Sequence, residues 1–213
     1  MTAAIRSALV EDADFIAHTI LSAQRGPMPR GWFDIALDWP EPRCLDFIGR
    51  LARARQRSWW HASQFMVAEI DGVPAAALCA LPSRGTRGAA GAALEEVARD
   101  AGMSAADLRA MFQRGAYSDG CWIQGGDDTW LIEHVASRPA YRGRGLMQGL
   151  IAHALAAGKA AGYARASISF LIGNAAAERC YAKAGFSFAD EKRDTAFEAL
   201  VGAPGFRRFE RAI

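Results

Sequence analysis

The segment Arg142-Gly143-Arg144-Gly145 stands between a predicted strand and a predicted helix, and it has the composition of an anion-binding loop. Glycines let the backbone turn tightly and present its N–H groups, and the N-terminus of a helix adds partial positive charge. With two arginines that can form charge-assisted hydrogen bonds, the loop would suit a phosphate or pyrophosphate group. A plain strand-to-helix turn with solvated arginines is the alternative interpretation.

Two common nucleotide-binding motifs are excluded. The chain has no Gly-Lys-Ser/Thr tripeptide, so it contains no P-loop. The dinucleotide-binding pattern G-x-G-x-x-G fails because Gln148 stands where the third glycine is required, one residue before Gly149. An anion bound at this loop would therefore be held by neither of these two motifs.

Tryptophans gather in the N-terminal third of the chain, at Trp32, Trp39, Trp59 and Trp60. Rings of this size are most often core or interface residues, and they can also line a binding pocket. The sequence leaves both interpretations open.

The composition is that of a folded globular domain. The 213 residues are 51% hydrophobic and 23% charged, and 25 Lys and Arg against 23 Asp and Glu give a net charge of +2. This small excess argues against nucleic-acid binding by net charge. No uncharged apolar run approaches the ~20 residues that span a bilayer, so no membrane partner is expected.

The four cysteines, at positions 44, 79, 121 and 180, are scattered and show no zinc-type spacing. No metal site is expected. Scattered thiols are typical of a reducing compartment, and the N-terminus lacks the long apolar segment of a secretory signal. The sequence therefore predicts a cytoplasmic protein.

Hydrophobic periodicity and turn residues indicate the elements that position these side chains. Asp71-Gly72 suits a type I′ hairpin turn, because that turn needs positive φ angles at both residues. The predicted strands are 3–9, 64–70, 73–80, 129–137, 165–171, 186–191 and 205–211. The predicted helices are 12–24, 43–57, 94–114 with a break at Gly102, 146–161 and 175–184, and residues 85–91 are predicted to form a loop of small residues. The helical stretch from about 92 to 115 is an insertion between strands of one α/β domain.

Three blocks of the chain resemble the GNAT superfamily of N-acetyltransferases. The segment Arg142 to Met147 matches the family's acetyl-CoA loop, Gln/Arg-x-x-Gly-x-Gly/Ala, in all but its last place. The preceding block, Glu133 to Tyr141, is similar to the family's fourth strand and the turn after it. Asn174, Tyr181 and the pair Gly185-Phe186 resemble its N…Y…GF signature.

The resemblance implies an α/β GNAT fold. Its central sheet would be mixed, mostly antiparallel and twisted, flanked by helices, with a helical insertion before the fourth strand. The chain would form a single domain over residues 1–213, with residues 129–191 as the acetyl-CoA-binding core.

The resemblance also implies a set of residues that bind acetyl-CoA. One strand edge would pair with the pantetheine arm, the loop amides would hold the pyrophosphate, and an asparagine and a tyrosine would complete the site. These residues are, in turn, Val135, Ala136 and Ser137; Arg142, Gly143, Arg144, Gly145, Leu146 and Met147; and Asn174 and Tyr181.

Met147 departs from the family pattern, which prefers Gly or Ala at that place. A larger side chain could weaken cofactor binding unless it points into the core. On a helical wheel Met147 falls beside Leu146, Leu150, Ile151 and Ala154, which favours a core direction.

The two expected catalytic residues are Tyr181 and Glu133. Tyr181 would protonate the departing CoA thiolate as general acid, and a core aromatic is its alternative role. Glu133 would accept the proton of the attacking amine, and a strand carboxylate held by an arginine is its alternative. Neighbouring His134 is expected on the opposite face of the strand, so at most one of the two would point into the site.

The expected function is acetyl transfer from acetyl-CoA to a primary amine, and a non-catalytic CoA-binding sensor or interaction module is the alternative. The sequence does not identify the acceptor. Dimers are frequent in the family, so a homodimer is one expected state.

Overall fold

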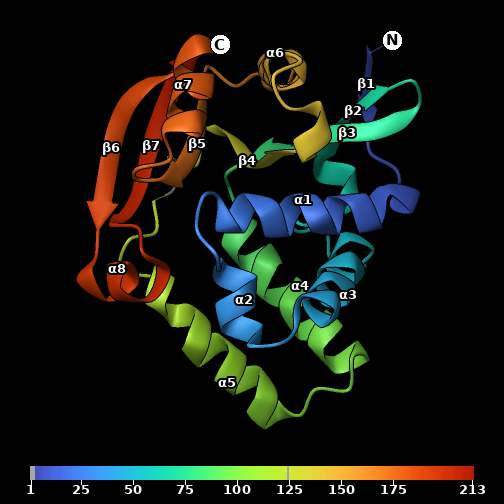
Figure 1. The fold of residues 1–213 in the computed structure, drawn as a ribbon, viewed down its shortest axis with the longest axis vertical. Coiled ribbons are helices and arrows are strands. Elements are labelled where there is room, and N and C mark those ends of the chain that lie inside the picture. The colour runs from blue at the N-terminus through green and yellow to red at the C-terminus, as the bar shows by residue number, and fades with distance from the viewer. Residues whose placement is uncertain (1–2, 124) are drawn as a thin grey trace.

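The computed structural model describes residues 3–123 and 125–213 and contains one seven-stranded sheet (Figure 1). The strand order is β1-β2-β3-β4-β5-β7-β6, and every neighbouring pair is antiparallel except β4 and β5. The strands are β1 Ala3–Ser7, β2 Phe65–Ile70, β3 Val73–Pro82, β4 Trp130–Ser137, β5 Arg165–Leu171, β6 Ser187–Arg193 and β7 Gly205–Ala212. This is the mixed, mostly antiparallel sheet that the family resemblance implies.

Helices cover both faces of the sheet. They are α1 Ala13–Arg25, α2 Trp32–Leu37, α3 Glu41–Ala52, α4 Thr86–Asp100, α5 Ala105–Gly115, α6 Leu146–Ala160, α7 Ala175–Lys183 and α8 Thr195–Val201. Alternate residues of β3 separate the two layers: Cys79 packs in the cluster of α1, α3 and α4, whereas Leu78 packs in the cluster of α6 and α7. Period-two alternation along each strand therefore builds a three-layer domain.

Local signals in the sequence account for several element boundaries. Asp71 and Gly72 have φ angles of 50° and 78°, as the predicted hairpin turn requires. Ser104 and Asp107 form a reciprocal capping box, which starts α5 after the break between the two inserted helices. The predicted insertion before the fourth strand is thus confirmed as α4 and α5.

Two helix boundaries differ clearly from the prediction. The helix predicted over residues 43–57 ends at Ala52. Residues 85–91 were expected to form a loop of small residues, but α4 begins at Thr86. The small side chains let this helix approach its neighbours closely, and Ala90 and Ala93 are buried in the α1–α3–α4 cluster. Two short helices, α2 and α8, were not predicted, since a six- or seven-residue helix carries little periodic signal.

The centre of the sheet splits where the site lies. β4 pairs with β5 only over Trp130–Ile132 and Ala166–Ile168. Beyond these residues β4 continues beside β3 alone, and β5 continues beside β7 alone. The edge of Glu133–Ser137 that faces β5 is therefore unpaired, and the two halves of the sheet diverge (Figure 1).

A β-bulge accompanies this split. Glu133 pairs with Cys79 and Ala136 pairs with Ala77, so two residues of β4, His134 and Val135, stand opposite one residue of β3. The backbone of His134 is left-handed, with a φ of 52°. An extra residue bends a strand and breaks the alternation of its side chains.

Candidate active site

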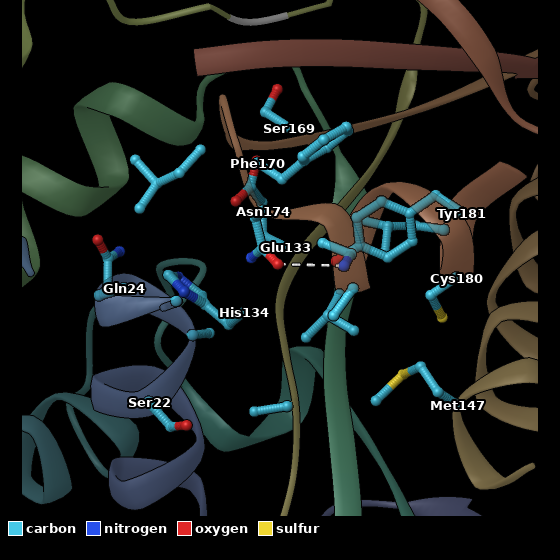
Figure 2. Close-up of a pocket in the computed structure, with 18 of the residues that line it drawn as sticks. Ser22, Gln24, Glu133, His134, Met147, Ser169, Phe170, Asn174, Cys180 and Tyr181 are labelled. Carbon is cyan, nitrogen blue, oxygen red and sulfur yellow. Dashed lines mark hydrogen bonds between the residues drawn. The ribbon is translucent and has the colours of Figure 1, made fainter. Parts of the chain in front are cut away.

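The diverging strands enclose a cleft of about 570 Å³ (Figure 2). Its walls come from both sides of the split, from the C-terminal end of α1, from the start of α6 and from α7. Nine of the predicted site residues line it: Glu133, Val135, Ala136, Ser137, Arg142, Gly143, Met147, Asn174 and Tyr181. Segments that are 48 positions apart in sequence, Glu133 and Tyr181, thus meet in one cavity.

The loop before α6 has the backbone geometry of an anion site. Gly143 and Gly145 both have a φ of 76°, and a Cβ at either position would meet no atom within 4 Å. Gly145 is the N-cap of α6. Among the described residues, the amides of Gly143, Gly145, Leu146 and Met147 donate to no acceptor. These donors are available to an external anion.

The two arginines of the loop are exposed and differ in position. Arg142 lines the cleft, whereas the Arg144 guanidinium lies over the ring of Tyr141, 5.4 Å from its centroid. Arg144, Gly145 and Leu146 do not line the cleft, so their predicted contact with a cofactor stays a prediction.

Met147 is half-buried and packs against the α6–α7 cluster while it also lines the cleft. Figure 2 shows its side chain on the α6 side, below Tyr181. The expected core direction is therefore correct in part, and the side chain does not fill the space over Gly143 and Gly145.

Asn174 is the N-cap of α7. Its Oδ1 accepts a hydrogen bond from the Ala177 amide at 3.1 Å. Asn174 also lines the cleft, so capping fixes the carboxamide at the cavity wall (Figure 2).

Tyr181 is 5% exposed and lines the cleft from α7. Its ring packs edge-on against Phe170, with centroids 5.5 Å apart. Burial, together with the nearby Cys180 thiol and Glu133 carboxyl, raises the pKa of Tyr181 well above its usual value. The hydroxyl keeps its proton near neutral pH, as a general acid must.

Glu133 is half-buried in the cleft, and burial raises the pKa of its carboxyl to about 8. Removal from water disfavours the charged carboxylate. No salt bridge holds this side chain among the described residues, so the alternative of an arginine-held carboxylate is wrong.

His134 corrects an expectation. Glu133 and His134 were expected on opposite faces of the strand, but both line the cleft. The His134 ring packs on Phe65 and Trp59, in the layer that also contains Cys79, the partner of Glu133. The bulge breaks the alternation, and the left-handed φ of His134 turns its side chain to the same layer. Burial lowers the pKa of His134 to about 3, so the imidazole is neutral.

Several lining residues were not identified from sequence. Trp122 and Ser169 line the cleft, and the Ser169 hydroxyl has no hydrogen-bond partner among the described residues. Gln148 ties α6 to α7, because its Nε2 donates to the Cys180 carbonyl at 2.9 Å. Trp59 belongs to the tryptophan group whose role the sequence left open, and it lines the cleft. None of these positions carries a local signal, since each is defined by contact across the fold.

Within residues 3–123 and 125–213, no group of three or more His, Cys, Asp and Glu side chains could hold a metal ion. No helix in that part of the chain combines the length and apolar character needed to cross a bilayer.

The fold and the cleft agree with the comparison to known families. The profile described as the Acetyltransferase (GNAT) family matches residues 32–186. The chain therefore belongs to the GNAT acetyltransferase family, and it is an enzyme of the acyltransferase class. That family uses acetyl-CoA as its acetyl donor.

Solved structures share this fold at low sequence identity. One described as an acetyltransferase is 17% identical, with a TM-score of 0.71 over 99% of each chain. An N-acetyltransferase from Staphylococcus aureus Mu50 is 19% identical, with a TM-score of 0.66 over 99% of this chain and 100% of that one. An N-acetylglutamate synthase from Neisseria gonorrhoeae, complexed with coenzyme A and N-acetyl-glutamate, is 14% identical, with a TM-score of 0.51 over 100% of this chain and 35% of that one. Among curated protein sequences, none matches this chain.

Proposed function

We propose that this enzyme is an N-acetyltransferase that moves the acetyl group of acetyl-CoA to a primary amine. The observation that carries the proposal is that four groups suited to acetyl transfer occur together at one cleft. An unpaired strand edge, a helix N-terminus with available amides, a neutral tyrosine and an unpaired glutamate line it or border it. Each group supplies a different part of the same reaction.

The residues of the cleft fit acetyl-CoA. The free edge of Val135–Ser137 offers backbone hydrogen bonds to an extended, amide-containing arm, as a neighbouring strand would. The amides at Gly143 and Gly145–Met147 suit a pyrophosphate, and Arg142 adds positive charge. The Asn174 carboxamide stands fixed at the wall beside that arm.

Two side chains handle the protons. When bound, acetyl-CoA supplies the acetyl group as a thioester. The Glu133 carboxylate accepts a proton from the acceptor nitrogen, and its pKa of about 8 lies near the working pH, where a general base is most effective. The Tyr181 hydroxyl donates its proton to the leaving sulfur. Backbone amides of the free β4 edge polarise the carbonyl that is attacked.

The donor site is tested by calorimetric titration with acetyl-CoA of the wild type and of two glycine variants. Gly145→Ala strains the loop at the start of α6, because its φ is 76°. Gly162→Ala imposes the same kind of strain just beyond the other end of α6, where φ is 86° and a Cβ again meets nothing within 4 Å. We expect only Gly145→Ala to weaken acetyl-CoA binding.

Transfer is then measured as thiol release with a panel of primary amines. Acetylated product from any of them supports the proposal. Acetyl-CoA binding without transfer to any amine would favour the non-catalytic CoA-binding module instead. A folded wild type that does not bind acetyl-CoA would refute the donor site.

A further inference from the structure

A second cavity, of about 280 Å³, adjoins the cleft. We call it the side pocket. It shares Gln24, Trp59, Trp122, Leu171 and Phe206 with the cleft, so the two cavities have a common wall. The other walls come from α2, α4, α5 and α8 and from the loop after α5, elements that lie together beside the split sheet (Figure 1). Nothing in the donor site described above uses this space.

Eight of the 18 residues that line the side pocket are aromatic. They are Trp32, Trp59, Trp60, Phe112, Tyr117, Trp122, Phe197 and Phe206. Trp32 and Trp60 stack with centroids 6.4 Å apart, and Trp59 touches both Trp60 and Trp122. Burial raises the pKa of Tyr117 above its usual value, so its hydroxyl stays neutral. With such a lining, the binding free energy is most favourable for a flat apolar group that packs against the ring faces.

Charge is confined to the mouth of the side pocket. Among the described residues, the only charged ones that line it are Arg87 and Asp119, and both are exposed. An acceptor with two amines would place its second ammonium group in this pocket. That group would lose its hydration, and no buried anion would compensate for the loss. Aromatic faces can attract cations, but the Arg87 guanidinium already lies over Trp122, 5.5 Å from the ring centroid. The charge distribution of the side pocket therefore disfavours a polycationic ligand.

The residues shared by the two cavities indicate how a ligand bound in the side pocket would extend into the cleft. Trp59 and Trp122, with ring centroids 5.2 Å apart, line both the side pocket and the cleft. Trp59 also packs edge-on against His134, the neighbour of Glu133, with centroids 6.3 Å apart. A group seated in the side pocket and attached to a short chain would reach the cleft beside these residues.

We infer that the acceptor is an arylalkylamine, whose aromatic ring occupies the side pocket while its primary amine lies in the cleft near Glu133. The inference rests on the proposed acetyl transfer, and it adds the chemical class of the acceptor.

α4 offers a variant and a matched control for the test. Gly91 lines the side pocket and Gly88 does not, and a Cβ at either position would meet no atom within 4 Å. Gly91→Leu therefore adds a side chain at the wall of the side pocket, and Gly88→Leu adds the same side chain to the same helix outside it. Both substitutions replace a helical glycine, so their effects on helix stability are alike.

The experiment compares kcat/KM for acetyl transfer to phenethylamine and to spermidine, and it measures phenethylamine binding in the presence of CoA by calorimetry. We expect the wild type to prefer phenethylamine by ~10-fold or more. Gly91→Leu should raise the KM and the Kd for phenethylamine by ~10-fold or more, while Gly88→Leu and the wild type agree. Acetyl-CoA affinity should be equal in all three proteins.

The possible failures are distinct. A higher kcat/KM for spermidine overturns the inference and leaves acetyl transfer standing. Absence of transfer to phenethylamine overturns the inference, and only absence of transfer to the whole panel of primary amines overturns the proposed function as well. Phenethylamine that binds the wild type and Gly88→Leu more tightly than Gly91→Leu supports the side pocket, whereas equal binding or no binding overturns it.

Discussion

The two sides of the split strand are built in opposite ways. The proposed donor side depends on backbone: an unpaired edge of β4 and the amides at the start of α6, both within residues 133–147. The proposed acceptor side depends on side chains: aromatic rings from α2, α5, α8 and the segments around Trp59 and Trp122, collected from residues 32 to 206. One side is local and exposed, and the other is long-range and mostly buried.

This difference indicates which side of the site would set specificity for the acceptor. Backbone amides and a helix N-terminus are available to many sequences, so they suit a donor that a whole family shares. A pocket of packed rings depends on each side chain that lines it, so it can differ from one relative to the next. The following predictions test whether the two sides respond separately.

The largest effect is expected from Tyr181→Phe, which removes one oxygen from the shared centre of the site. The ring and its packing against Phe170 remain, so the fold and acetyl-CoA binding should be preserved. Loss of the proton donor should lower kcat by about 10³-fold. Steady-state kinetics and calorimetry on the same preparation check this. An unchanged kcat would assign Tyr181 to the core alone.

Glu133→Gln should lower kcat/KM by about 10²-fold near neutral pH, because the amide cannot accept the proton. The base is active only as the carboxylate, so its contribution should rise with pH through about 8. The ratio of wild-type to Glu133→Gln kcat/KM should therefore increase from about pH 6 to about pH 9. This ratio cancels the ionisation of the acceptor amine, and a flat ratio would exclude Glu133 as the base.

The same carboxyl predicts a pH-dependent stability difference. Its folded pKa lies above the unfolded value, so ionisation opposes folding, and stability is lost as pH rises toward about 8. The Tm of Glu133→Gln relative to the wild type should increase between about pH 5 and about pH 9. Thermal melts at the two pH values measure it, and a constant difference would contradict the burial of this group.

Gly115→Ala should affect the acceptor side alone. A Cβ there would stand 2.7 Å from Cζ2 of Trp32, whose indole N–H donates to the Gly115 carbonyl at 3.1 Å. Displacing this wall of the side pocket should destabilise the fold by about 1–3 kcal/mol and raise the acceptor KM, with acetyl-CoA affinity unchanged. Denaturant unfolding and calorimetry measure both. Gly145→Ala is the corresponding variant of the donor side, and it should weaken acetyl-CoA binding with the acceptor KM unchanged. If either variant impaired acetyl-CoA binding and acceptor binding equally, the two sides would not respond separately.

The smallest effect is expected from Arg142→Ala. This arginine is exposed at the cleft mouth, where salt and water screen its charge. Acetyl-CoA affinity should fall by only about 3- to 10-fold, and the difference should shrink as salt is added. Calorimetry at two ionic strengths checks this. A loss that salt leaves unchanged would mean that Arg142 acts through a buried contact.

The sequence by itself determined the local structure of the proposed donor side. Gly143 and Gly145 indicate positive φ angles, Asn174 indicates a helix cap, and the spacing of these residues predicts a strand, a loop and two helices in order. Such features depend on backbone preferences within a few residues, so they can be read locally. The hairpin at Asp71-Gly72 and the capping box at Ser104 were predictable for the same reason.

Only the tertiary structure decided the rest. The bulge that turns Glu133 and His134 to one layer depends on the register between β3 and β4, and the side pocket depends on rings brought together from Trp32 to Phe206. Burial, which raises the pKa values of Glu133 and Tyr181, likewise comes from the surrounding fold. Register, packing and desolvation are interactions between distant segments, and no local pattern of residue types encodes them.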